Sequence, residues 1–127
     1  GRKLPLPDNS VDCVTIAFGL RNIRPREDAY AEIRRVLVAE GKLCILEFGS
    51  GRRPILGGLY NLYLCRLLPL LGRMISRDPQ AYAYLAQTIQ AFPPPSALES
   101  ELGEAGFSRV RGRSLSAGIV WLHTAYR

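Results

Sequence analysis

Two polar residues follow directly on an apolar, β-branched run near the start of the chain. The run, residues 11–18, is typical of a strand that is covered on both faces, and the segment Phe18-Gly19-Leu20 leads from it to Arg21 and Asn22. In an open α/β sheet, ligands bind beyond the carboxyl ends of the strands. Arg21 and Asn22 could therefore position a polar substrate, or they could only tie down a turn; their position favours neither interpretation.

A carboxylate and a histidine are the other candidates for chemistry. Glu47 lies at the carboxyl end of a second apolar run, residues 42–48, where it could contact a ligand or simply pair with a nearby arginine. His123 is the one histidine of the chain, which excludes a metal site built from histidines. It lies inside a terminal apolar run, and this favours a structural role.

Three cysteines complete the inventory of reactive residues. Cys13, Cys44 and Cys65 have no metal-ligand spacing, and their number is odd. Cys13 and Cys44 lie within strand-like apolar runs, so we expect both to behave as small buried hydrophobes. This usage suits a reducing cytoplasm, and it predicts neither a disulfide framework nor a bound metal.

Composition indicates one globular unit with a basic surface. The 127 residues are 47% hydrophobic and carry a formal net charge of +6. Lys3 and Lys42 are the lysines, and every other basic residue is an arginine, a side chain suited to phosphate and carboxylate. The arginines are scattered and not interleaved with aromatic residues, so we expect contact with anionic headgroups and no nucleic acid. The chain does not begin with methionine, and we expect that its first residue is not a native start.

The first half reads as strand, helix and strand. After the strand at 11–18, an amphipathic helix is predicted over residues 26–38, with Gly41 at its carboxyl-terminal stop. The strand at 42–48 follows. Such a βαβ unit predicts two parallel strands.

The middle of the chain is strongly apolar. Residues 55–75 could span a bilayer by length, but Arg66 and Pro69 would then lie near its centre. A helical cover over an apolar pocket, or an interfacial helix, is the better interpretation. The tyrosines of this region could be core residues with hydrated hydroxyls or the wall of a pocket for an aromatic substrate; they are Tyr60, Tyr63, Tyr82 and Tyr84.

The last third returns to sheet. A helix through residues 82–90 ends before a run of prolines, and a short helix follows with Ser96 as the expected N-cap and Glu99 completing a capping box. That helix should end near Ala105 and Gly106. Two strands, at 107–115 and 118–126, are predicted to pair antiparallel around the turn at 116–118.

The polar residues after the first strand belong to a longer pattern. The block Phe18-Gly19-Leu20-Arg21-Asn22, with the proline-punctuated run at residues 4–12 before it, resembles the ubiquinone/menaquinone biosynthesis C-methyltransferases. The resemblance covers essentially the whole chain, and the first block is specific to this family among methyltransferases. Further matching segments follow in the same order: Arg35-Val36-Leu37, Gly41-Lys42-Leu43, Leu46-Glu47-Phe48, Asp78, Tyr82, Tyr84-Leu85-Ala86, Ile89, Ala105-Gly106-Phe107, Ala117-Gly118 and Leu122-His123.

The resemblance implies an α/β fold and a cofactor. The fold would be the carboxyl-terminal part, strands four to seven, of a class I methyltransferase Rossmann-like sheet, with an apolar helical insertion and a terminal antiparallel hairpin. Residues 1–127 would form the carboxyl-terminal portion of a single methyltransferase domain, without its glycine-rich cofactor-binding half. The implied cofactor is S-adenosylmethionine, contacted by Gly1, Ala17 and Phe18. Ala17 stands where some members have a serine, so that hydrogen bond is lost here.

The implied reaction is C-methylation of a polyprenylated quinol, either a demethylmenaquinol or a ubiquinol precursor. As catalytic residues, Arg21 would stabilise the phenolate and Asn22 would orient the ring or a water. Arginine cannot accept a proton, so water or a carboxylate such as Glu47 or Asp78 would do so. The implied substrate-binding residues are Glu47, Tyr60, Tyr63, Asp78 and Tyr82. The apolar segment would hold the isoprenoid tail.

The resemblance also implies where the enzyme works and with what. We expect a cytoplasmic protein, peripheral at the inner face of the membrane, acting as a homodimer or within a quinone-biosynthesis complex. Without its amino-terminal part we expect the chain to be inactive. Two alternatives stay open: an inactive remnant that binds a quinone or a partner protein, and a related methyltransferase acting on another aromatic or lipid substrate.

Overall fold

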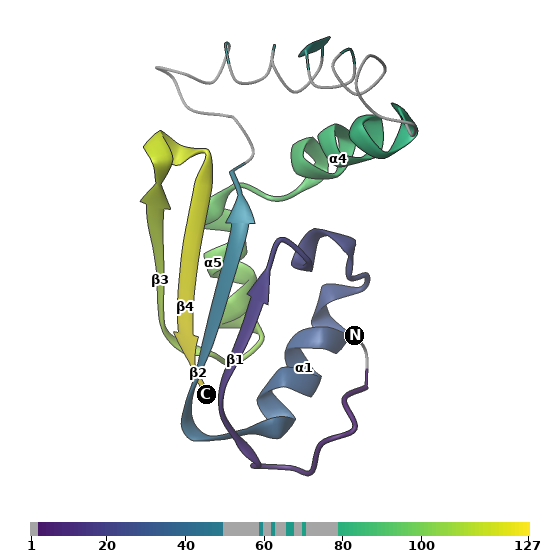
Figure 1. Ribbon diagram of the computed structural model, residues 1–127. Helices are drawn as coiled ribbons and strands as arrows, with labels where there is room; N and C mark the ends of the chain where they lie inside the picture. The colour runs from purple at the N-terminus through teal and green to yellow at the C-terminus, as the bar shows by residue number, and fades with distance from the viewer. Residues whose placement is uncertain (1–2, 50–58, 60–61, 63–65, 68–69, 71–78) are drawn as a thin grey trace.

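The computed structural model describes residues 3–49, 59, 62, 66–67, 70 and 79–127. Within this part, four strands form one mixed sheet in the order β1-β2-β4-β3 (Figure 1). β1 and β2 are parallel, whereas β4 is antiparallel to both of its neighbours. The elements are, in chain order, β1 (Val11–Ala17), the short helix η1 (Leu20–Asn22), α1 (Arg26–Val36), β2 (Leu37–Phe48), α4 (Pro79–Ala91), α5 (Pro95–Glu104), β3 (Ser108–Leu115), the short helix η3 (Ser116–Gly118) and β4 (Val120–Tyr126).

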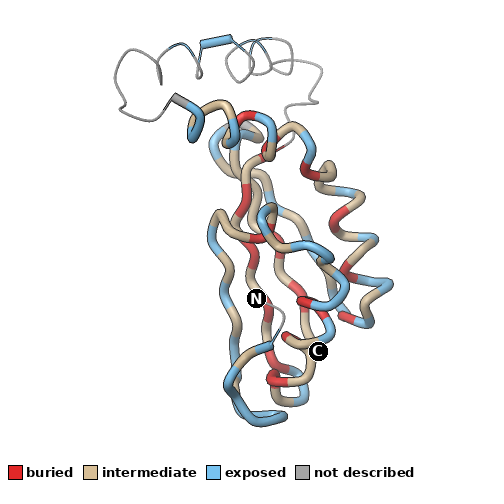
Figure 2. Tube along the Cα trace, turned by 90° about the vertical axis from the view of Figure 1, so that its right-hand side faces the viewer, coloured by how far each residue is buried: buried red, intermediate tan, exposed pale blue. Residues whose placement is uncertain are grey.

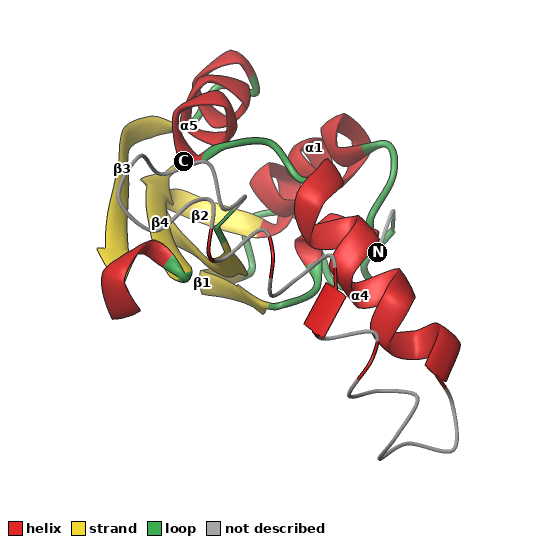
Figure 3. Cartoon of the chain, turned by 90° about the horizontal axis from the view of Figure 1, so that it is seen from above, coloured by secondary structure: helices red, strands yellow, loops and turns green. Residues whose placement is uncertain are grey.

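Helices α1 and α5 cover one face of the sheet (Figure 3). Their apolar side chains pack with those of the central strand β2 into a single core cluster, for example Ile33 of α1, Leu102 of α5 and Ile45 of β2. Buried positions therefore alternate with half-buried and exposed ones along strands and helices (Figure 2). The predicted parallel βαβ unit and the predicted terminal antiparallel hairpin are both confirmed.

Strand β1 is covered on one face in this part of the chain, so the prediction of a strand buried on both faces was wrong. Val14 and Ile16 pack against the core cluster. Cys13 and Thr15, which point to the other face, are exposed. Side chains alternate across a strand, so a layer on one side buries only every second residue. Cys13 is accordingly not a buried hydrophobe, Cys44 beside it is half-buried, and Cys65 lies outside the described residues.

The end of α1 also differs from its prediction. The helix ends at Val36 and β2 begins at once, so that Gly41 lies within the strand and is not a helix stop. The register explains the difference: Val11 pairs with Leu37 but Cys13 pairs with Lys42, so β2 carries an irregular excursion between the two pairs. A Cβ on Gly41 would approach the Val38 carbonyl oxygen to 2.8 Å, and this close approach requires glycine.

Helix α5 has the predicted end but not the predicted beginning. Gly106 adopts φ +92°, and the Phe107 N–H donates to the Leu102 carbonyl at 3.1 Å, which is a Schellman arrangement. At the other end the N-cap is Pro94, without a side-chain cap, so the expected capping box of Ser96 and Glu99 was wrong. Pro95 occupies the first helical position, where its missing N–H costs nothing, and it moves the helix start upstream of Ser96.

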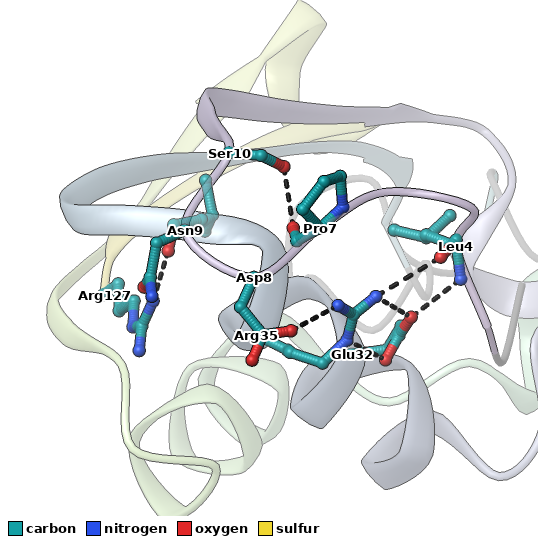
Figure 4. Close-up of polar contacts among 9 residues, drawn as sticks. Leu4, Pro7, Asp8, Asn9, Ser10, Glu32, Arg35 and Arg127 are labelled. Atoms are coloured by element: carbon teal, nitrogen blue, oxygen red, sulfur yellow. Dashed lines mark hydrogen bonds and ion pairs between the residues drawn. The ribbon is translucent and has the colours of Figure 1, made fainter.

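Arg35 of α1 holds the loop that leads into β1 (Figure 4). Its guanidinium donates to Asp8 Oδ1 at 2.6 Å and to both carboxylate oxygens of Glu32. Glu32 in turn accepts the Leu4 backbone N–H at 2.7 Å. The arginine thus ties the proline-punctuated run to α1 and sets the point at which β1 begins.

Helix α4 lies over the carboxyl end of β2. Its Ala86 and Ile89 are buried against Phe48, the last residue of that strand. The helix is longer than the predicted 82–90. Most of the apolar stretch 55–75 lies outside the described residues, as do Tyr60, Tyr63 and Asp78. Among the described residues, no helix has the length and apolar character needed to cross a membrane.

Candidate active site

Arg21 and Glu47 meet at the carboxyl edge of the two parallel strands. Arg21 lies in η1, just after β1, and Glu47 lies one residue before the end of β2. The arginine Nη1 donates to Glu47 Oε1 at 2.8 Å, and its distance to Oε2 is 3.4 Å. The side chains are 11% and 1% exposed, respectively. Of the two interpretations open for Glu47, the structure supports pairing with an arginine.

The backbone before Arg21 turns sharply to allow this contact. Phe18 has φ +53°, a left-handed conformation that costs a non-glycine residue on the order of 1 kcal/mol. Its N–H still donates to the Leu46 carbonyl at 2.8 Å, and its own carbonyl accepts Arg21 Nη1 at 2.5 Å. Arg21 therefore also ties down the turn, so the structural interpretation of this residue holds alongside its place at the ligand-binding edge.

Burial dominates the electrostatics of the pair. Desolvation raises the pKa of the Glu47 carboxyl, and the charge and hydrogen bond of Arg21 offset part of that rise. The Arg21 guanidinium also lies over the Phe48 ring, with Cζ 5.7 Å from the ring centroid. Arg21 Nε is buried and has no hydrogen-bond partner among the described residues. Buried polar groups are normally hydrogen-bonded, so an unpaired N–H at a strand edge marks a place where a ligand oxygen could supply the missing partner.

Asn22 is joined to α4. The Tyr84 hydroxyl donates to Asn22 Oδ1 at 3.2 Å, over a sequence separation of 62 residues. Tyr82 is half-buried on the same helix. Residues two apart do not share a helix face, so Tyr82 and Tyr84 do not line one common wall. The sequence marked Tyr84 only as a core or pocket residue, and nothing in its local pattern indicated Asn22 as its partner.

The residues expected to contact the cofactor lie at the same edge or outside the described part. Ala17 is the last residue of β1 and is exposed, and Phe18 follows it with its ring 4.7 Å from that of Phe48. The contacts of these two residues with the cofactor stay predictions. Gly1 is not among the described residues, so its predicted contact stays a prediction.

His123 is placed away from this edge. It is buried on β4 opposite Ile45, on the sheet face that the helices cover. Burial lowers the pKa of His123 to about 4, so the ring is neutral at neutral pH. This agrees with the structural role expected for it. The described residues contain no group of three or more metal-ligating side chains.

A separate cavity of about 250 Å³ lies between α1 and α5. Its lining includes Tyr30 and Arg34 of α1 and Glu101 of α5, but not Arg21 or Glu47. Glu101 is already engaged there, since Arg26 donates to both of its carboxylate oxygens at 2.9 and 2.7 Å. We regard this cavity as the crevice between two packed helices.

A known protein family matches the chain along its whole length. The model of the ubiE/COQ5 methyltransferase family matches residues 1–127. The ubiquinone/menaquinone biosynthesis C-methyltransferase UbiE of Pseudomonas fluorescens is 45% identical over 121 residues, which is 95% of this chain and 47% of that protein. The UbiE of Pseudomonas aeruginosa is 44% identical over the same shares. The chain thus spans about half the length of the curated relatives it matches.

Solved structures share the fold at low sequence identity. A SAM-dependent methyltransferase from Aquifex aeolicus superposes with a TM-score of 0.62 at 19% identity, covering 98% of this chain and 50% of that one. A SAM-dependent methyltransferase from Thermotoga maritima gives a TM-score of 0.65 at 17% identity, covering 98% and 60%. The predicted fold class is confirmed, and S-adenosylmethionine is confirmed as the cofactor of this family and fold.

Proposed function

Because the chain belongs to the ubiE/COQ5 methyltransferase family, we propose that the native protein containing it methylates a ring carbon of a polyprenylated quinol. The names of the relatives support a quinol of either the ubiquinone or the menaquinone series. The observation that carries the proposal is the Arg21 side chain at the carboxyl edge, which is 11% exposed, is charge-balanced by Glu47 and has an Nε–H without a partner among the described residues.

The chemistry needs a group that stabilises negative charge on a ring oxygen. When bound, S-adenosylmethionine supplies a methyl group on a positively charged sulfur. The net change would replace a ring C–H by C–CH₃, release one proton and, by loss of the methyl C–S bond, leave the donor sulfur as a neutral thioether. Electron density from the neighbouring hydroxyl oxygen drives the attack. A preorganised donor at that oxygen contributes the largest single effect in such sites. We assign Arg21 Nε–H to that oxygen.

Glu47 supports Arg21 and does not itself take the proton. Its carboxylate accepts from Arg21 and balances the guanidinium charge, so taking up a proton would leave Arg21 without its counter-charge. Pairing the two charges lets a guanidinium lie among apolar groups such as Phe18 and Phe48, where a quinol ring can also pack. We therefore assign proton acceptance to water. Asp78, the other carboxylate considered, lies outside the described residues.

The apolar middle segment suits a lipid substrate. Four of its described leucines are exposed: Leu59, Leu62, Leu67 and Leu70. Together with the net charge of +6, they support a protein that works peripherally at the cytoplasmic face of a membrane and holds the isoprenoid tail there. Residues Tyr60, Tyr63, Asp78 and Tyr82 stay predicted substrate contacts. Association with a second copy or with other quinone-biosynthesis proteins also stays a prediction.

The test is methyl transfer by the native protein. Purified enzyme, S-adenosylmethionine and either a demethylmenaquinol or a benzoquinol precursor should give a product one CH₂ heavier, with the new methyl on a ring carbon. Arg21→Ala should lower kcat by about 10²–10³-fold, since one stabilising donor is lost. Arg111→Ala, an exposed arginine on β3, is the matched control and should leave kcat unchanged.

Other outcomes separate the alternatives. Methylation of catechols or phospholipids but not of quinols would replace the proposed substrate. Binding of a quinol without methyl transfer, by a native protein no longer than this chain, would favour the inactive remnant. Full activity in Arg21→Ala would remove the role assigned to Arg21.

A further inference from the structure

We propose that Tyr84 is a positioning residue that orients the Asn22 amide, so that its NH₂ group faces the substrate's ring oxygen beside Arg21. The inference rests on the proposed function, because it assigns a second donor to the same phenolate. Its basis is the contact between α4 and η1, in which the Tyr84 hydroxyl donates to Asn22 Oδ1 at 3.2 Å.

An amide side chain has two different ends. Its oxygen accepts hydrogen bonds and its NH₂ group donates them. In Asn22 the oxygen is engaged by Tyr84, so the NH₂ group is the end that can serve a ligand oxygen. Asn22 directly follows Arg21 in η1, so the two residues offer donors at adjacent positions of the same edge. A ring oxygen that gains negative charge is stabilised by donors and not by a second acceptor.

Packing holds Tyr84 in place although its ring is exposed. Ala86 and Ile89 of α4 are buried against Phe48, and the Arg21 guanidinium lies over the same Phe48 ring. Helix α4 is thereby packed against Phe48, the residue next to Glu47. Tyr84 reaches η1 from this fixed helix.

Because the contact between Tyr84 and Asn22 is exposed, we infer that it orients the Asn22 side chain and contributes little to the stability of the fold. Tyr84 is 58% exposed and Asn22 is exposed too, so both groups would be hydrated if they separated. Such a bond adds little net stability, because water replaces it. A net contribution of about 1 kcal/mol still gives a severalfold preference for the amide orientation in which the NH₂ group is left for the reacting ring. A change at Tyr84 should therefore alter catalysis without altering folding.

The first test is a double-mutant cycle in the native protein. Tyr84→Phe should lower kcat severalfold, with KM for the quinol and Tm nearly unchanged, since a misdirected donor acts on the transition state. Asn22→Ala should lower kcat further, and adding Tyr84→Phe to it should have no further effect. Tyr126→Phe, at the far end of β4, is the matched control and should behave as wild type.

The second test does not depend on turnover. In ¹⁵N-labelled protein, the side-chain amide resonances of Asn22, assigned by their loss in Asn22→Ala, should move in Tyr84→Phe and stay in place in Tyr126→Phe. Unmoved resonances, unchanged kcat in Tyr84→Phe, or an equal loss in the Asn22→Ala background would each overturn the inference. If the wild type methylates no quinol but the resonances move as expected, the proposed function fails and the orientation of Asn22 stands.

Discussion

Removing the positive charge from Arg21 should leave the buried Glu47 carboxylate without its counter-charge. Arg21→Met keeps much of the side-chain length but leaves Glu47, 1% exposed, without its partner at 2.8 Å. With an effective dielectric constant of about 20, the attraction lost at that distance is on the order of 6 kcal/mol. Part of it only offset the cost of desolvating the pair, so the net loss of stability should be about 3–5 kcal/mol.

The loss should depend on pH in a defined direction. Burial already raises the pKa of the Glu47 carboxyl, and loss of Arg21 removes the influence that lowers it. A carboxyl whose pKa is higher in the folded than in the unfolded protein is neutral in both states at low pH. Between the unfolded-state pKa and the higher folded-state pKa, only the unfolded state loses its proton. The folded state therefore loses stability relative to the unfolded state as pH rises through this range. Arg21→Met should therefore be more destabilised at pH 8 than at pH 5.

Urea unfolding of four proteins measures both effects. Wild type, Arg21→Met, Glu47→Gln and the double variant would be unfolded at each pH and followed by circular dichroism. We expect the double variant to be clearly more stable than Arg21→Met at pH 8, because no charge is left buried. A loss below about 1 kcal/mol in Arg21→Met, or additive losses in the double variant, would refute the reasoning about this pair.

Three further changes test other contacts. His123 has a pKa of about 4 in the fold and 6.5 as the reference value, so stability should fall by about 3 kcal/mol as pH drops from 6.5 to 4. His123→Phe should abolish that slope in thermal unfolding. Gly49→Ala should cost about 1–3 kcal/mol by the same measurement, because its Cβ would lie 2.3 Å from the Gly118 carbonyl oxygen; an unchanged Tm would contradict this. Arg35 lowers the pKa of Glu32 to about 2, so the wild type should lose stability as pH falls from 4.5 toward 2. Glu32→Gln has no carboxylate to protonate, and its thermal unfolding should lack this part of the pH dependence.

The local sequence pattern was sufficient to predict most helices and strands of the described part. The apolar runs predicted β1 and the paired part of β2, and Gly106 predicted the end of α5, because strand period and turn chemistry act over a few residues. The place of Arg21 and Asn22 after a strand followed from the same reasoning. Where two local signals competed, as with Ser96 and the prolines before it, the pattern chose the wrong helix start.

The sequence by itself thus determined the elements, the family and the edge at which Arg21 lies. Only the tertiary structure decided that Arg21 pairs with Glu47, 26 residues away, and that Tyr84 reaches Asn22 across 62 residues. These contacts depend on the parallel register of β1 and β2 and on the packing of α4 against Phe48. Register and packing arise from burial of whole faces, so no short stretch of sequence specifies the partner of a single side chain.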